Sequence, residues 1–240
     1  MFEVLLTKKW ISLTLIVLIL NPAFKSLSDW QYRRLATRQE FNAQIINAQK
    51  LPASEFTSIA PNGQIQNQTD LWRTVTAVGS FLVSEQYLLR KRSLESEAGL
   101  WVVTPFRTVD GEVITVVRGW TAAGASATEN PKLSAITTDQ ISLTGRLREI
   151  TPKYFDEPSD LPSGQRMGID PKYGDAYLEL VSSSPQLNSP EIVHLPMPTL
   201  TDGPHHSYAL QWLLFIVMLD GGYLILLRND LIERRKLTVV

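Results

Sequence analysis

Two apolar runs, one near each end of the chain, form the strongest pattern in this sequence. Residues 10–27 are almost continuously aliphatic at their centre, and residues 206–227 contain Asp220 as their one charged side chain. A helix needs about 20 mainly apolar residues to cross a hydrocarbon core of about 30 Å. The pattern therefore predicts two transmembrane helices, the first of them barely long enough and kinked near Pro22.

Lys8 and Lys9 before the first run would also suit a cleaved signal peptide. No small-x-small cleavage site follows the run, so an uncleaved helix is expected.

The stretch after the first run predicts a helix at the membrane surface. Residues 28–50 carry only a ragged helical stripe of apolar positions, and they either begin a new helix or continue the first. Trp30 suits an interfacial aromatic belt; the alternative is that it faces a partner or cofactor together with Arg33.

Between the two runs, the spacing of apolar residues changes from irregular to every second residue. Six strand-like segments rich in Val, Thr, Leu and aromatic residues lie within 70–181, namely 71–83, 86–90, 99–106, 111–120, 141–150 and 175–181. No helix-long periodic segment separates them, which argues against a βαβ fold. We predict an antiparallel β domain curled into a small barrel or sandwich. The five prolines of residues 184–204 predict an extended connection back to the membrane.

Charge predicts the orientation of the chain in the membrane. The two ends, 1–9 and 228–240, hold six basic side chains in 22 residues, whereas 28–205 holds 16 in 178. Basic residues concentrate on the cytoplasmic side. We therefore expect a multi-pass plasma-membrane protein in contact with lipid, with a cytoplasmic N-terminus (1–9), a cytoplasmic tail (228–240) and an extracytoplasmic domain (28–205).

Composition narrows the chemistry. The net charge of -1 gives no basic field that would point to nucleic acid. With no cysteine, the chain has no disulfide, thiolate metal site or thiol nucleophile. It also lacks the spacing of a Ser-His-Asp triad, a phosphate-binding glycine loop and a paired-histidine metal motif. We therefore do not expect an enzyme.

Three histidines and one intramembrane carboxylate remain as candidates. His205 and His206 lie at the outer mouth of the second predicted helix, where an imidazole either ligates haem iron or copper or meets lipid headgroups and water. His194, in the proline-rich stretch, is expected at the surface. Asp220 is costly within a membrane unless it is protonated and locally hydrogen-bonded or contacts a partner subunit. At its depth we expect the first helix to offer only hydroxyl side chains.

Five segments in order along the chain resemble motifs of one known family, the SURF1 (Shy1) family of cytochrome c oxidase assembly proteins. They resemble its Gly-x-Trp-Gln-x-x-Arg, its Gly-aromatic strand ending in Pro, its Arg-Gly-Trp signature, the strand after that, and its Gly-Pro-His-x-x-Tyr-Ala-x-Gln-Trp helix start. In this sequence the segments are 28–34, 99–105, 118–120, 143–147 and 203–212. Ser28 and His206 depart from the family's usual Gly and Leu. The likeness is strongest to actinobacterial members.

The resemblance implies a role in the maturation of aa3-type haem-copper oxidase, by handling haem a or inserting it into oxidase subunit I. The family's histidine maps onto His205, and His206 is a second candidate for the haem iron. The haem site implied in this way comprises His205, His206, Tyr208, Trp212, Trp30, Arg33 and Arg118. Arg118 would pair with a propionate, or else form a structural salt bridge. The alternative function is a scaffold or accessory subunit without haem that binds other subunits of the oxidase or of a respiratory supercomplex, with Asp220 as the partner contact.

Overall fold

The computed structural model describes residues 2–124, 129–151 and 161–238. The chain forms two compact units, a helical unit of Met1–Asn42 with Leu200–Val240 and a β unit of Ala43–Thr199. Residue 1 and residues 239–240 of the predicted cytoplasmic ends lie outside the described residues. The helical unit contains the two apolar runs, and the β unit contains the segments with a period of two.

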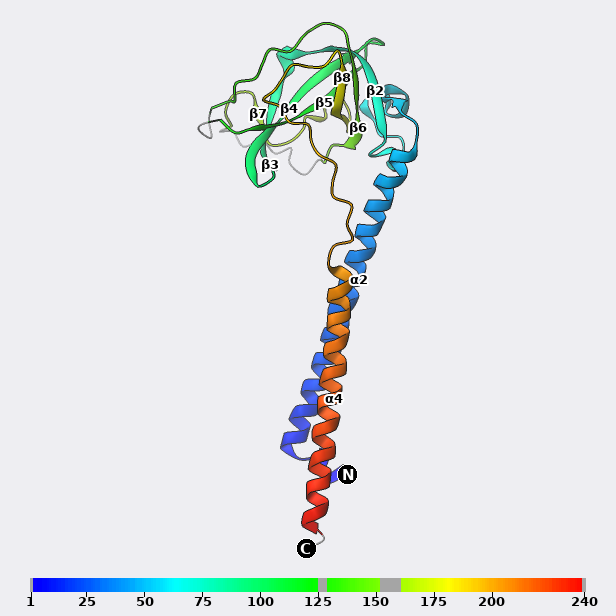
Figure 1. Ribbon diagram of the computed structural model, residues 1–240, viewed down its shortest axis with the longest axis vertical. Helices are drawn as coiled ribbons and strands as arrows, with labels where there is room; N and C mark the ends of the chain where they lie inside the picture. The colour runs from blue at the N-terminus through cyan, green and yellow to red at the C-terminus, as the bar shows by residue number, and fades with distance from the viewer. Residues whose placement is uncertain (1, 125–128, 152–160, 239–240) are drawn as a thin grey trace. The chain divides into compact units, whose positions relative to one another are not determined.

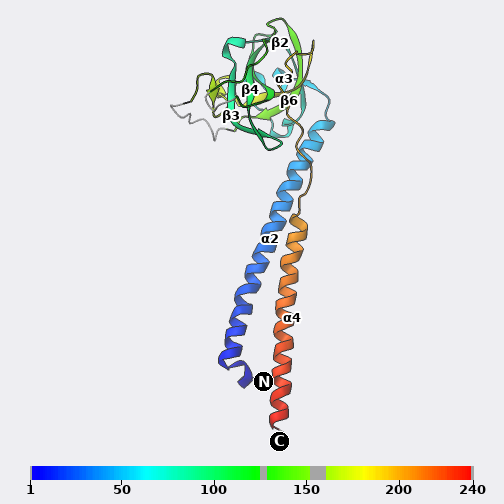
Figure 2. The same ribbon diagram turned by 60° about the vertical axis from the view of Figure 1, so that its left-hand side comes forward.

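The helical unit consists of two long apolar helices and one short helix. α1 is Phe2–Leu5, α2 is Lys8–Lys50, and α4 is His205–Thr238. α2 has no break at Asp29, so the predicted segments 10–27 and 28–50 form one helix that contains Pro22 and ends two residues before Pro52. α2 and α4 lie side by side, with the two ends of the chain at the same end of the pair (Figure 2).

The β unit is a closed barrel to which short strands and short helices are attached. Each of the six segments predicted as strands overlaps one strand. These are β2 Thr74–Phe81, β3 Tyr87–Leu94, β4 Glu97–Thr108, β5 Val113–Ala122, β6 Ile141–Glu149 and β8 Ala176–Ser184. Two-residue strands β1 Ser54–Glu55 and β7 Gln165–Arg166 were not predicted, nor was the short helix α3 Phe56–Ile59. Single turns of 3-10 helix lie at Pro61–Gly63, Gln68–Asp70, Val83–Glu85 and Pro171–Tyr173.

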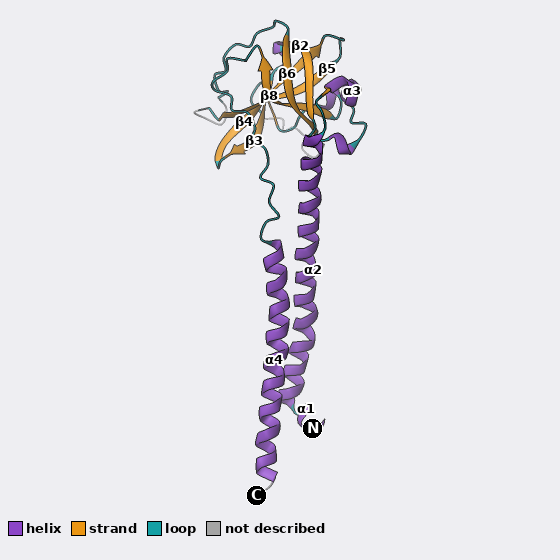
Figure 3. Cartoon of the chain, turned by 45° about the vertical axis from the view of Figure 1, so that its right-hand side comes forward, coloured by secondary structure: helices purple, strands orange, loops and turns teal. Residues whose placement is uncertain are grey.

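Five strands close the ring in the order β2-β6-β8-β5-β4, and β4 pairs back with β2 (Figures 1 and 3). Of the two predicted forms, small barrel or sandwich, the barrel is observed. The prediction that the domain is antiparallel is wrong at one contact, because β5 pairs with β8 in parallel. The other four contacts are antiparallel. Each antiparallel contact reverses strand direction, so a ring of five strands cannot close with every contact antiparallel. The order and directions are those of a Greek-key barrel of the OB type.

Alternating side chains of these strands fill the barrel. Phe106, Ile114, Leu143 and Leu178 have no exposed surface and belong to one apolar cluster inside the ring. α3 covers this cluster with the fully buried Phe56. The barrel is therefore held by a conventional apolar core, in agreement with the absence of cysteine.

A segment of the proline-rich connection crosses β5, and we call residues 185–199 the strap. Val193 of the strap and Trp120 of β5 exchange two backbone hydrogen bonds, each 2.8 Å long. Gly119, beside Trp120, has a φ of 149°, and a Cβ there would lie 2.4 Å from the Val193 carbonyl oxygen. The glycine of the Arg-Gly-Trp motif is thus required for the strap to approach the strand.

Replacing Gly119 by alanine should push the strap away from β5. We expect the free energy of unfolding to fall by more than about 1 kcal/mol, because the new methyl group meets backbone and the φ suits glycine. Amide hydrogen exchange of Trp120 and Val193 should speed up more than that of residues elsewhere in the barrel. Alanine at Gly111, where nothing lies within 4 Å of the added carbon but φ is also positive, is the matched control for backbone strain alone.

Candidate functional site

The contact between α2 and α4 is made of aromatic and polar side chains. Trp10 meets Tyr223 edge-on with ring centroids 5.5 Å apart, and Phe24 stacks on Trp212 at 5.7 Å. Farther along, Ser28 is buried and donates a hydrogen bond to the backbone carbonyl of Ala209 at 3.1 Å. The serine at this motif position therefore fits within close helix packing.

Asp220 has a partner inside the chain. Asn21 Nδ2 donates to Asp220 Oδ1 at 2.8 Å, directly before Pro22 of α2. The expectation that α2 offers only hydroxyl groups at this depth is wrong, because the helix pair is offset from the register that the two sequences suggest; Thr14 instead contacts Tyr223. The other Asp220 oxygen makes no hydrogen bond with any residue that the structure describes.

At the start of α4, the two histidines have different surroundings. His205 Nδ1 lies 2.9 Å from Gln31 Oε1, so it donates to this carbonyl when the proton is on Nδ1. His205 is half-buried, and its Nε2 makes no hydrogen bond within the described part of the chain. His206 is exposed and lies edge-on to Tyr32, with ring centroids 6.3 Å apart. His205 is thus the oriented imidazole of the pair.

A hollow of about 510 Å³ opens beside His205 in the helical unit. Its walls include His205, Gly203 and Thr201 from the segment before α4, and Arg34, Arg38 and Phe41 from α2. Two arginines and one phenylalanine thus face the same space as the oriented histidine.

The segment before α4 is fastened to α2. Arg38 Nε donates to the Thr201 carbonyl at 3.1 Å, and Gln39 Nε2 donates to Asp202 Oδ2 at 2.9 Å. Gly203 follows with a φ of 66°, a turn that leads into the helix. These contacts hold one wall of the hollow in place.

The predicted aromatic and basic site residues take different positions. Trp30 and Tyr208 are 46% and 48% exposed, whereas Trp212 packs on Phe24. Arg33 is exposed and does not line the hollow. Arg118 belongs to the β unit, and its described contacts are all made there.

The sequence argument missed Gln31, Arg34 and Arg38. A signal was available, because Gln31, Arg34, Arg38 and Phe41 recur at the three- and four-residue spacing of one helix face. Arg34 is also the arginine that matches the family motif. Arg33 lies about 100° round the helix from Arg34, and the choice between them needed the direction of the helix face.

Arg118 does not form the structural salt bridge that was one prediction for it. It is 1% exposed, yet no carboxylate among the described residues lies within ion-pair distance. Its Nη1 donates to Gln86 Oε1 at 3.1 Å and its Nη2 to Ser189 Oγ at 2.8 Å. Burial lowers the pKa of Arg118 to about 10, and the charge of Glu191 opposes this.

The hollow beside His205 has the donor set that a haem would need. An imidazole with a free Nε2 can bind iron, and the hydrogen bond at Nδ1 fixes the ring and raises its basicity. Two guanidinium groups suit the carboxylates of propionate arms, and an aromatic wall suits a macrocycle. Within the described residues, no cluster of three or more His, Asp or Glu side chains that could hold a metal ion is found.

Comparisons with known proteins agree with the predicted resemblance. The sequence model of the SURF1 family matches residues 18–217. An uncharacterised SURF1-like protein of Mycobacterium tuberculosis is 26% identical over 230 residues, which are 91% of this chain and 83% of that protein. A SURF1-like protein of Rickettsia felis is 36% identical over 109 residues, 44% of this chain and 45% of the relative.

Proposed function

The chain belongs to the SURF1 family, and from this premise we propose that it assists assembly of aa3-type cytochrome c oxidase by holding haem a for delivery to subunit I. The observation that carries the proposal is the oriented histidine beside the arginine-lined hollow. In this role haem a is cargo, and the protein is a carrier with no reaction of its own.

The surface of the two long helices supports a membrane location. Both are long and apolar enough to cross a membrane, and only 6% and 0% of their most apolar windows is buried within the chain. Such surfaces need lipid or protein around them. Termini at the same end of the helix pair suit two crossings, and the basic residues favour the cytoplasmic side of the plasma membrane for that end.

The residues of the hollow would divide the work of holding haem a. His205 would bind the iron through Nε2 while Gln31 keeps the ring turned toward the hollow. Arg34 and Arg38 would neutralise the propionates, and Phe41 would contact the macrocycle. A single protein ligand suits transfer, because release then requires the exchange of one iron–nitrogen bond.

Trp30, Tyr208 and Trp212 would extend the apolar surface at the membrane interface. Trp30 and Tyr208 are exposed enough to contact a large ring, whereas Trp212 already packs on Phe24. His206, one residue beyond His205, would be a second, less oriented ligand.

A second candidate function is a scaffold that binds oxidase subunits without haem. The observation in its favour lies on α4, where a Cβ at Gly221 or Gly222 would meet nothing within 4 Å. Small residues in open space allow a foreign helix to approach closely. Asp220, adjacent to them and with one carboxylate oxygen unbonded, would be the polar contact with that partner.

Affinity purification in mild detergent tests the proposal directly. We expect the full chain to retain oxidase subunit I and to show the absorption spectrum of haem a. Subunit I without haem would favour the scaffold instead. If neither is retained from a strain that makes the oxidase, the assembly function itself is wrong.

A further inference from the structure

A bulge in β5 sets the position of the Arg118 side chain within the β unit. Val102 of β4 pairs with Gly119, but Val103 pairs with Val117, so Arg118 is an extra residue without a partner on β4. β8 has a similar bulge, because its pairing with β6 omits Val181. Bulges turn a side chain away from the position that alternation would give it, and they are common beside binding sites.

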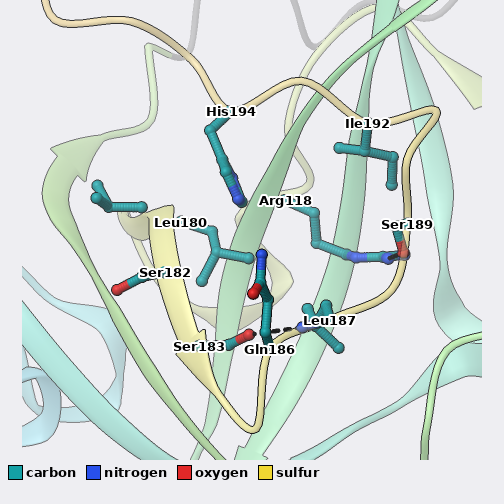
Figure 4. A pocket seen from close by; sticks show the side chains of 10 residues that line it. Arg118, Leu180, Ser182, Ser183, Gln186, Leu187, Ser189, Ile192 and His194 are labelled. Carbon is teal, nitrogen blue, oxygen red and sulfur yellow. Dashed lines mark hydrogen bonds between the residues drawn. The ribbon is translucent and has the colours of Figure 1, made fainter.

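These two bulges lie where β5 and β8 separate. Their parallel pairing ends at Val117 and Glu179, one residue before Arg118 and two residues before Val181. A hollow of about 350 Å³ lies at this point, between β8 and the strap. Figure 4 shows Arg118 reaching toward Ser189 on one side, with His194 and Gln186 projecting toward the same space from the strap.

The guanidinium at this hollow is buried with no carboxylate of the described residues within ion-pair distance, and the only carboxylate charge found to act on it is that of the more distant Glu191. Besides its bonds to Gln86 and Ser189, its Nε is buried and has no hydrogen-bond partner. A buried charge is costly unless it is paired, and a buried donor left unsatisfied adds to this cost. The ring of Phe81, 5.8 Å from the guanidinium carbon, offers only weak compensation.

The walls of the hollow indicate the size and nature of the missing partner. Leu180, Leu187 and Ile192 form an apolar part, and the exposed Ser182, Gln186 and His194 form a polar part. A volume near 350 Å³ lies at the small end of the range for small-molecule sites. The ligand should therefore combine an acceptor group for Arg118 with a short apolar body.

We propose that this hollow binds a small monocarboxylate, with its carboxylate on Arg118 and its apolar body against Leu180, Leu187 and Ile192. Among the described residues that line the hollow, Arg118 is the only arginine or lysine. One buried guanidinium balances one negative charge, and a dianion would leave a charge uncompensated. The residues that line this hollow belong to the β unit and none of them lines the hollow beside His205, so the proposal does not depend on the function proposed above.

NMR of the full chain in detergent micelles, with nitrogen-15-labelled arginine, tests the proposal at the unbonded Nε–H group of Arg118. The Nε–Hε signal of Arg118 is identified by its absence in Arg118→Lys. Butanoate should move this signal saturably, and butanamide, the neutral isostere, should bind at least about tenfold more weakly, since a charge-assisted bond is lost. Inorganic phosphate should also bind more weakly than butanoate.

Two variants separate the site from fold effects. Ser182→Phe alters an exposed position on the wall, should fill the hollow while leaving Arg118 in place, and should weaken butanoate binding about tenfold or more. Arg107→Gln, an exposed arginine of β4, is the matched control and should leave binding unchanged. Equal binding of butanamide, tighter binding of phosphate, or an Arg118 signal that butanoate does not shift would each overturn the proposal. A shift caused by haem but not by butanoate would overturn it as well, and would assign Arg118 to a propionate of the cargo.

Discussion

His205→Ala is expected to reduce the haem a retained by the purified protein by more than about 100-fold. Loss of a hydrogen-bonding partner behind a metal ligand already lowers the affinity about 10- to 100-fold, and loss of the ligand itself should lower it further. Gln31→Leu, which removes the acceptor at His205 Nδ1 2.9 Å away, should give the smaller loss of about 10-fold. The measurement is the haem a absorbance per protein after detergent purification.

His206→Ala is the matched control, since it removes an imidazole one residue away that has no oriented hydrogen bond. It should retain most of the haem. If His206→Ala loses the haem and His205→Ala keeps it, the assignment of the ligand is wrong. If neither variant, nor the two combined, lowers the haem content of a protein that carries haem, the hollow beside His205 is not the haem site.

Glu179→Gln is expected to lower the free energy of unfolding of the β unit by about 3–5 kcal/mol, a large part of the stability of a domain of this size. Glu179 is 3% exposed and lies between two arginines, with Oε1 2.7 Å from Arg146 Nη2 and Oε2 3.0 Å from Arg148 Nη1. Arg146 is itself buried, and Arg148 stacks on Trp72 with its guanidinium carbon 3.4 Å from the ring centroid. Removal of this carboxylate leaves both guanidinium groups with no described carboxylate within ion-pair distance.

Chemical denaturation of the full chain in detergent, followed by tryptophan fluorescence, measures this loss. Glu97→Gln is the control, because Glu97 is an exposed carboxylate on β4 and its loss should change stability by less than about 0.5 kcal/mol. Apolar replacement of Glu179 together with Arg146 and Arg148 should recover much of the loss, since an uncharged cluster has no charge to compensate. A loss below about 1 kcal/mol for Glu179→Gln would show that the three charges do not act as a unit.

The strands show how much of the β domain a periodic sequence pattern can predict. All six predicted segments contain strands because Val, Thr and aromatic residues at alternate positions favour an extended chain with one buried face. The pattern did not show β1 or β7, since two residues are too few to carry a period. It also did not show the parallel contact between β5 and β8, which follows from the closure of five strands into a ring.

For the site residues too, the sequence predicted local motifs but not contacts between residues far apart in the chain. The motif that contains His205 could be identified from adjacent residues alone, and so could the helix that it begins. Its link to Gln31 joins residues 174 positions apart, and that of Asp220 to Asn21 joins residues 199 positions apart. No local pattern specifies such pairs, and a shift of one position on α2 was enough to select Arg33 instead of Arg34.

The amino-acid sequence was thus sufficient for two long apolar helices, a β domain between them, the family, and the histidine at the start of α4. These properties depend on hydropathy, period and short motifs, which are local. The tertiary structure alone decided that Arg118 is buried with no described carboxylate within ion-pair distance, that Asn21 meets Asp220, and that Arg34 and Arg38 share a hollow with His205. Such facts depend on strand register, on two bulges and on the relative rotation of two helices, and these are set by packing between residues far apart in the chain.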